Sequence, residues 1–483
     1  MRCVIANGKK KAKLIFRAEL IIGFVFLFIV SFSAVVIAQF DAHDPGVRGS
    51  TVDAGRPFPS VAQNANASEF FANGLARFQA VESVQGGTNN GLGPRFNTNQ
   101  CSSCHAQPSI GGSSPSTTAF PFVGPNPETQ VFNLNGARNT LPSFVTPDGP
   151  TVEARFKFLL NPNGALSNQA DGGVHDLFVI QGRSDAGNCQ INQPNFAHNL
   201  ALNNVIFRIP TPTFGAGLIE NIADETILAG MSANAAVKQA VGISGHPNRN
   251  GNDGTIARYG WKAQNKSLVV FAGEAYNVEM GVTNDLFPNE RPSPDEELAG
   301  GLPASCKLNP TPEDTSNLAA QQYYQVSSDI VQFGMFMRML APPTPSADRP
   351  GGAASIENGR KNFVMTGCAL CHTPVMTTAP SSMSADLSQV EAHLFSDLLV
   401  HHMGTNLADG ISQGSAGPDE FRTAPLWGLG QRIFFLHDGR TKDLMDAITE
   451  HASTGSEANG VIARFQALTQ QQKQDLLNFL RSR

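Results

Sequence analysis

The chain has 483 residues, of which 41% are hydrophobic and 15% charged, a composition typical of a folded protein with about two to four domains. Intrinsic disorder as the main state is therefore excluded. The formal net charge is −6 at pH 7, although the first 17 residues contain six basic residues, so the remainder is more acidic still. Such a chain lacks the basic surface that binds phosphate backbones, and we expect no nucleic-acid partner.

A targeting segment opens the chain. Residues 1–19 are rich in Lys and Arg, and residues 20–38 are apolar or small and end in Val36-Ile37-Ala38, which suits signal peptidase. Residues 20–38 are also long enough to span a bilayer, so residues 1–38 are either a signal peptide or an N-terminal membrane anchor. Both alternatives export the remainder, which we expect to be periplasmic, either soluble after cleavage near Ala38 or anchored to the inner membrane.

Helical and strand-like segments follow in turn. Residues 68–81 carry apolar side chains at helical spacing, and a glycine-rich loop at 86–94 comes after them. Residues 112–215 are rich in Asn, Pro and Gly and hold short strand-like runs, which indicates a loop-and-strand insertion. The strand-like runs are 152–160, 175–181 and 204–209, and the next helical patterns are 217–229, 267–278 and 317–340.

A proline-rich linker at residues 342–353 predicts a domain boundary. After it, residues 355–366 predict a helix with Ser355 as its N-cap, and residues 470–481 predict a closing helix. The linker divides the exported chain into residues 39–341 and residues 354–483.

Two copies of one cysteine motif indicate the chemistry of the protein. Residues 101–105 read Cys-Ser-Ser-Cys-His and residues 368–372 read Cys-Ala-Leu-Cys-His, and both match C-x-x-C-H, the attachment pattern of a c-type haem. Two thiols three positions apart can form thioethers with the two vinyl groups of one porphyrin, and the adjacent imidazole then reaches the iron. The sequence therefore predicts two covalently bound haem c groups. Their attachment residues are Cys101, Cys104, Cys368 and Cys371, and their iron ligands are His105 and His372.

A structural zinc site and a thioredoxin-like redox pair are the alternatives for these cysteines. Zinc would need its four ligands brought together from two distant half-sites, and a thioredoxin motif would not need the trailing His twice. Of the other cysteines, Cys3 lies in the targeting segment. Cys189 and Cys306 either pair as a disulfide in the oxidising compartment or remain free.

The layout of helix, C-x-x-C-H motif and closing helix is that of a small cytochrome c domain. We therefore predict a mainly α fold with two c-type cytochrome domains. The N-terminal haem c domain covers residues 39–341 and is enlarged by the insertion at about 112–215, and the C-terminal cytochrome c domain covers residues 354–483.

Several segments between residues 65 and 483 resemble the bacterial di-haem cytochrome c peroxidase superfamily, and more closely its di-haem oxidoreductase branch, whose members are described as thiol oxidoreductases. The segments are residues 91–97, 214–220, 258–262, 279–283, 395–399 and 436–440. The resemblance implies that oxidant reacts at the N-terminal haem and that the C-terminal haem stores and relays electrons.

The resemblance also implies a second ligand for the relay haem. In the family this ligand follows the His-Asp-Gly motif, and the matching position, 14 residues after His437, is His451. The segment 441–451 looks helical, so it could direct one imidazole inward. Imidazole in place of the peroxidases' Met should lower the haem potential. A surface position for His451 is the alternative, and His401 and His402 beside Met403 form a second candidate set.

Two residues near the reactive haem are implied by the same resemblance. Glu279 matches a carboxylate above the distal haem face, where it would take a proton from peroxide and return it to the leaving oxygen. The alternatives are a Glu that closes a surface helix, Glu220 in the same role, and Met280 as an iron ligand in a resting state. Trp261 matches a tryptophan between the two haems, or is simply a core aromatic residue.

The resemblance does not extend to the family's calcium site, because residues 431–434 replace the expected Thr-Ala-Pro run, so a bound calcium ion is doubtful. We expect an exported di-haem c-type cytochrome oxidoreductase of peroxidase type, which takes electrons from a small periplasmic donor protein and reduces hydrogen peroxide or another small oxidant. A two-haem electron carrier without peroxide turnover is the alternative. A third possibility keeps the enzyme but changes its chemistry, since relatives of this architecture oxidise protein side chains or cleave polymers with oxygen.

Overall fold

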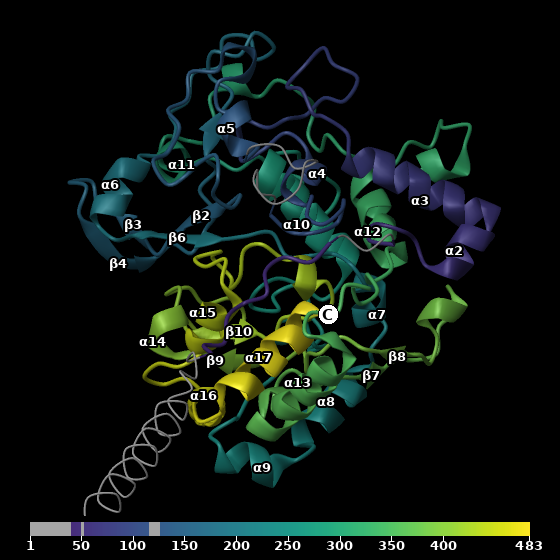
Figure 1. Cartoon of the computed structure of the whole chain (residues 1–483). Coiled ribbons are helices and arrows are strands. Elements are labelled where there is room, and N and C mark those ends of the chain that lie inside the picture. Colours follow the sequence, from purple (N-terminus) through teal and green to yellow (C-terminus); the bar gives the residue numbers. More distant parts are fainter. Residues whose placement is uncertain (1–39, 50–52, 115–125) are drawn as a thin grey trace, which may run out of the picture. The chain divides into compact units, whose positions relative to one another are not determined.

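Three helices pack together beside the first cysteine motif, as the computed structural model shows (Figure 1). They are α3 (Ala65–Phe78), α10 (Leu268–Met280) and α12 (Asp329–Met339), and α12 contacts the other two. Gly74 allows the close approach of α3 to α12, because a Cβ atom there would lie 2.7 Å from the Gln332 carbonyl oxygen. The ring of Phe78 lies 5.0 Å from that of Phe336 between the same helices.

The structure describes residues 40–49, 53–114 and 126–483, so the predicted targeting segment at 1–38 lies outside the described residues. Within these ranges, His43–Arg483 form one compact unit. None of the helices described is both long and apolar enough to cross a membrane. Helices and loops predominate over strands, so the expectation of a mainly α fold holds only loosely, and the boundary at 342–353 stays a prediction.

The strands form small antiparallel pairs, several of them in the predicted insertion. The pairs are β1 (Arg95–Phe96) with β5 (Phe178–Val179), β2 (Glu153–Phe156) with β6 (Val205–Arg208), β3 (Phe158–Leu160) with β4 (Leu166–Ala170), β7 (Met376–Thr377) with β8 (Glu391–Ala392), and β9 (Val400–His402) with β10 (Glu420–Arg422). The predicted run at 152–160 is thus two strands with different partners. Cys189 and Cys306 form a disulfide, which links this region to the segment that precedes α12.

In the C-terminal part, α13 (Gly352–Thr366) lies along α17 (Gln470–Arg481) (Figure 1). The bounds of α17 are those predicted, and a capping box between Thr469 and Gln472 fixes its start. The prediction of Ser355 as the N-cap of α13 is wrong. The helix begins earlier, after Gly351, and the buried Ser355 hydroxyl donates to Asp475 of α17 at 2.5 Å.

Four other predicted helices differ from the structure by three residues or more, and the first of them, predicted at 68–81, is α3 (Ala65–Phe78). The pattern at 317–340 is α-helical only from Asp329, because the Asp314 carboxylate accepts the first two amide protons, from Asp329 and Ile330, and fixes the start there. The pattern at 217–229 is divided by a turn into α7 (Ala216–Glu220) and α8 (Asp224–Ser232). The segment at 441–451 contains the shorter α15 (Leu444–Thr449).

The remaining helices are short and connect these elements. They are α2 (Pro59–Gln63), α4 (Cys101–Cys104), α5 (Glu128–Val131), η1 (Leu134–Gly136), α6 (Phe196–Ala201), α9 (Ala235–Ala240), α11 (Pro294–Leu298), η2 (Ala304–Cys306), η3 (Tyr323–Gln325), η4 (Cys368–Leu370), η5 (Ala385–Leu387), α14 (Gly404–Leu407), η6 (Leu429–Gln431) and α16 (Asn459–Gln466).

Candidate functional site

The first cysteine motif lines a cavity of about 1110 Å³. The short helix α4 brings Cys101, Cys104 and the following His105 to its wall. His105 Nδ1 lies 3.0 Å from the Gly112 carbonyl oxygen, and since a carbonyl only accepts, this nitrogen carries the proton. Nε2 is then the nitrogen available to a metal, and burial lowers the pKa of His105, which favours the neutral, ligating form.

The second motif lines a separate, more apolar cavity of about 1350 Å³. Four of the described histidines line it, namely His372 after η4, His401, His437 and His451 after α15. His372 Nδ1 lies 3.0 Å from the Phe395 carbonyl oxygen, and His451 Nδ1 lies 2.7 Å from that of Ala447. In both rings Nδ1 therefore carries the proton and Nε2 does not, as in His105, and His451 lines the cavity.

The four motif cysteines are free thiols, as thioether formation requires. None of the four is in a disulfide. Burial raises the pKa of the Cys101 thiol to about 12 and that of Cys368 to about 11, so both are neutral thiols. The two motifs line separate cavities, so their cysteines do not together form one four-ligand zinc site. Large cavities with buried thiols and adjacent neutral imidazoles fit haem.

Trp261 lines both cavities. Its indole nitrogen donates to the Ile209 carbonyl oxygen at 2.8 Å, and the Arg432 guanidinium lies over its ring, 5.9 Å from the ring centre. Its backbone carbonyl accepts from the Arg422 amide at 2.8 Å. The side chain is thus buried, as a core aromatic would be, and it also contributes to the walls of both cavities.

Glu279, near the end of α10, lines the first cavity together with other ionisable groups. Its carboxylate accepts from the Asn97 side-chain amide at 2.7 Å, and it is half-buried because it faces the cavity. Burial, and after it the charge of Glu153, raises the pKa of Glu279 well above its usual value. Glu220 does not line this cavity, because it pairs with Arg338 and accepts the Leu268 amide proton. The sulfur of Met280 lies 3.7 Å from that of Cys101.

Sequence reasoning missed the strands of the insertion as part of this site. Glu153 and Arg155 on β2 both line the first cavity, and so does Arg208, which pairs opposite Glu153 on β6. Arg208 also bonds the buried Asp409 at 2.6 Å. Alternation along β2 places residues 153 and 155 on one face, a signal already present in the sequence. What the sequence could not supply is that this face lies on the cavity.

The second candidate set of histidines is placed differently from His451. His401 lines the second cavity, but its Nδ1 lies 2.7 Å from Glu457 and its Nε2 lies 3.0 Å from Asp397, so neither nitrogen is available to iron. His402 does not line either cavity. Cys371, Asp397 and His401 also form a compact group of possible metal ligands. The Cys371 sulfur belongs to the haem motif, so we do not assign a separate ion to this group.

Two cavities, each with a C-x-x-C-H motif and a neutral histidine, define a di-haem protein. The model of a family described as "di-haem oxidoreductase, putative peroxidase" matches residues 166–483, more than half of the chain. The chain belongs to this di-haem oxidoreductase family. The resemblance inferred from the sequence is thereby confirmed, and haem-based oxidoreductase chemistry is the general activity of the family.

Two solved structures are similar to this chain over part of its length. A MauG-like protein associated with microbial copper homeostasis is 15% identical, with 54% of this chain and 88% of that one covered and a TM-score of 0.25. Hydrazine synthase of Kuenenia stuttgartiensis is 18% identical, with 33% of this chain and 58% of that one covered and a TM-score of 0.21. The match thus spans little more than half of the hydrazine synthase chain. No curated protein matches the sequence.

Proposed function

We propose that the protein is an exported di-haem c-type cytochrome oxidoreductase of peroxidase type, in which a C-terminal relay haem passes electrons to an N-terminal reactive haem. The observation that carries the proposal is the unequal lining of the two cavities. His372 and His451 both line the second cavity with Nδ1 on a backbone carbonyl oxygen and Nε2 unprotonated, whereas His105 is the only histidine among the described residues that lines the first. An iron held by two imidazoles transfers electrons, and an iron held by one can bind an oxidant.

Cys101, Cys104 and His105 would hold the first haem, and Cys368, Cys371, His372 and His451 the second. When bound, haem iron supplies oxidant binding and one-electron chemistry. Burial raises the pKa of Glu279 and so favours the protonated form of its carboxyl group, and Asn97 fixes the group by donating to Oε2. The carboxyl group can exchange that proton with a small oxidant in the cavity, which is general acid and base work.

Trp261 links the two halves of this proposal. Its side chain lines both cavities and is held by the Ile209 carbonyl oxygen, so it would be a fixed aromatic group between haems bound there. The proposed donor of electrons to the relay haem is a small periplasmic protein, and the proposed oxidant is hydrogen peroxide or another small molecule.

Export to the periplasm is part of the proposal. The Cys189–Cys306 disulfide supports it, because structural disulfides persist in oxidising compartments. The composition of residues 1–38 supports it as well, whether that segment is cleaved or anchors the protein. Calcium is not part of the proposal.

Low-temperature EPR and visible spectroscopy of the purified haem-loaded protein, before and after one-electron reduction and then with hydrogen peroxide, test the function. We expect one low-spin haem and one haem that is high-spin or becomes so on reduction, with rapid oxidation by peroxide. Two low-spin haems that do not respond to peroxide in any redox state would make the protein an electron carrier instead.

A further inference from the structure

Two arginine side chains line the second cavity, and both are buried. Arg422 on β10 is 8% exposed, and Arg432, which follows η6, is 9% exposed. Among the described residues that line this cavity, they are the only Arg or Lys side chains. Burial lowers the pKa of each to about 10, and for Arg432 the charge of Arg422 adds to this effect. Since these values remain well above neutral pH, both guanidinium groups keep their positive charge.

Both arginines contact the segment that contains Trp261. The Arg422 amide donates to the Trp261 carbonyl oxygen at 2.8 Å, and Arg422 Nε donates to the Gly260 carbonyl oxygen at 3.1 Å. The Arg432 guanidinium lies over the Trp261 ring, 5.9 Å from the ring centre. Two like charges are therefore held on the same wall of the cavity.

No carboxylate of the described chain compensates the charge of Arg432. Its Nε and Nη2 are enclosed without a hydrogen-bond acceptor, and no acidic side chain acts on its pKa. Asp397 is the only carboxylate among the described residues that acts on the pKa of Arg422. Its Oδ2 lies 3.0 Å from His401 Nε2, so this carboxylate already has a partner.

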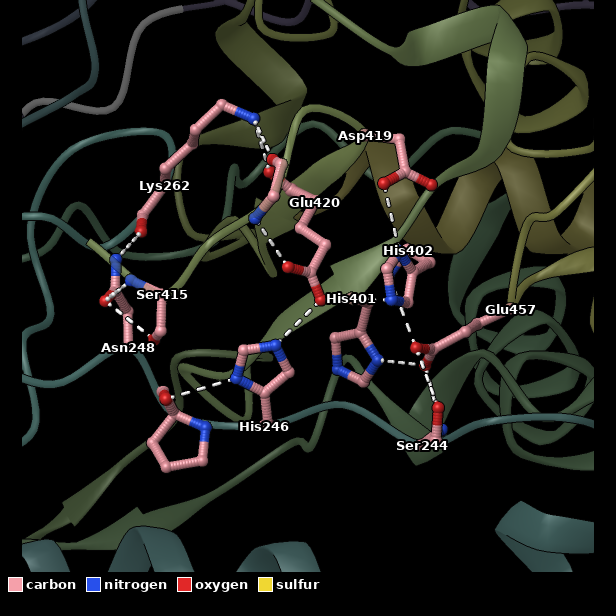
Figure 2. Close-up of polar contacts among 12 residues, drawn as sticks. Ser244, His246, Asn248, Lys262, His401, His402, Ser415, Asp419, Glu420 and Glu457 are labelled. Atoms are coloured by element: carbon pink, nitrogen blue, oxygen red, sulfur yellow. Dashed lines mark hydrogen bonds and ion pairs between the residues drawn. The ribbon is translucent and has the colours of Figure 1, made fainter. Parts of the chain in front are cut away.

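Glu457 is the only acidic side chain among the described residues that line the second cavity, and it is also held elsewhere (Figure 2). Glu457 Oε2 lies 2.7 Å from His401 Nδ1, and Oε1 accepts from the Ser244 hydroxyl at 3.0 Å. The lining of the cavity therefore supplies two positive charges and no free negative charge to match them.

The arginines that line the first cavity are different, because each has an acidic partner. Arg155 pairs with Glu153, and Arg208 pairs with Asp409 at 2.6 Å. A charge buried without a partner is costly, so buried charges in proteins are normally paired. Two neighbouring charges without partners on one cavity wall therefore indicate that the cavity holds an anion.

We propose that Arg422 and Arg432 bind the propionate carboxylates of the haem in the second cavity. The inference rests on the relay haem of the proposed function. A haem has two propionates, which are ionised at neutral pH, so its negative charge matches the two guanidinium groups. Arginine pairs with carboxylates through charge-assisted hydrogen bonds and stays charged when buried. Fixed positive charges beside a haem favour its reduced state, so the two arginines raise a potential that two imidazole ligands lower.

Potentiometric titration of the haem-loaded protein, followed through the low-spin EPR signal of the second haem, tests the site with Arg432→Gln. We expect a lower midpoint potential than in the parent, because one fixed positive charge is lost. Arg432→Lys keeps the charge and should stay closer to the parent. Arg360→Gln is the matched control, since it removes the same group from an exposed position on α13, where Arg360 pairs with Glu357. It should titrate like the parent.

Resonance Raman spectroscopy identifies the anion. The propionate bending band of the second haem should shift in Arg432→Gln and in Arg422→Gln, and the second variant replaces the first if the first does not fold. Retention of both haems by mass shows that a variant is folded.

Equal potentials in the parent and in Arg432→Gln would overturn the proposal. A lower potential with an unmoved propionate band, or a parent potential that shifts on addition of acetate, would assign the arginines to a free carboxylate from solution and overturn it as well. Neither readout uses peroxide. Absence of peroxide turnover would therefore contradict the proposed function while the propionate contacts are still measured.

Discussion

Burial and the neighbouring His451 together lower the pKa of His372 to about 4, and the two rings line one cavity from different elements of the chain. Each ring has its Nδ1 on a backbone carbonyl oxygen. Neutral imidazoles with the same free nitrogen are what a bis-histidine haem requires, and low-spin iron is the consequence.

Replacement of His451 by Ala therefore tests the second ligand. We expect one low-spin haem to become high-spin while both haems remain attached, because the attachment cysteines are untouched. EPR of the oxidised protein measures the spin state, and His393→Ala serves as the control since that ring is exposed. A spectrum identical to that of the parent would remove His451 from the iron.

If each haem is attached covalently, removing the cysteines of one motif should remove the mass of one haem from the protein. The double variant Cys101→Ser/Cys104→Ser should lose one haem in denaturing mass spectrometry, and Cys368→Ser/Cys371→Ser should lose the other, because each pair supplies both thioethers of one porphyrin. Retention of two haems by either variant would contradict c-type attachment at that motif.

Glu279→Gln tests the proton-exchanging carboxyl group. The amide keeps an oxygen that can accept from Asn97 but cannot exchange a proton, so we expect peroxide turnover to fall by about 10²- to 10⁴-fold with both haems retained. The matched control is Glu391→Gln on the exposed strand β8, which should turn over peroxide at the parent rate. Equal rates in all three proteins would assign proton transfer to another group.

Glu128 gives the protein a predicted pH dependence of stability. Burial raises its pKa from 4.5 to about 8, so between these values the unfolded chain has lost the proton that the folded chain keeps. Its contribution to the free energy of unfolding is full below about 4.5 and falls as the pH rises toward about 8. Urea unfolding across this range should show the fall in the parent protein.

Glu128→Gln is the comparison for that measurement. Gln keeps an oxygen that can accept from the Val152 amide, a bond of 2.8 Å, but it has no titrating proton. The variant should therefore lose this part of the pH dependence, and parallel profiles for the two proteins would show that Glu128 ionises normally.

Removal of the disulfide should lower stability without changing the haems. Cys189 and Cys306 are 117 residues apart and both are buried, so Cys189→Ala/Cys306→Ala should cost about 2–5 kcal/mol in the free energy of unfolding. Denaturant unfolding without reductant measures the difference. No change in the midpoint would mean that the two sulfurs are not joined in the folded protein.

Local patterns predicted the parts of the molecule that local interactions determine. The capping box at Thr469 marks the start of α17, the hydroxyl of Ser267 accepts the Val270 amide at the start of α10, and both helices have about the predicted bounds. The two C-x-x-C-H motifs are local too, because one porphyrin dictates their spacing. Motifs of this local kind are what make the family recognisable in the amino-acid sequence.

Long-range contacts explain what the sequence did not reveal. The start of α12 depends on Asp314, which precedes it by 15 residues. The Ser355 hydroxyl donates to Asp475 instead of capping α13. His401 is excluded as a ligand by Glu457, which is 56 residues away. Glu153 reaches the first cavity only through strand pairing across the insertion, which periodicity cannot predict.

Trp261 belongs to the walls of both cavities and is fixed through its indole nitrogen and its backbone carbonyl. The two cavities are therefore adjacent, and the Trp261 side chain belongs to the wall of each. Replacing Trp261 with a smaller side chain changes the surroundings of both haems at once. A shift in the visible spectrum of such a variant must therefore be assigned to the two haems together.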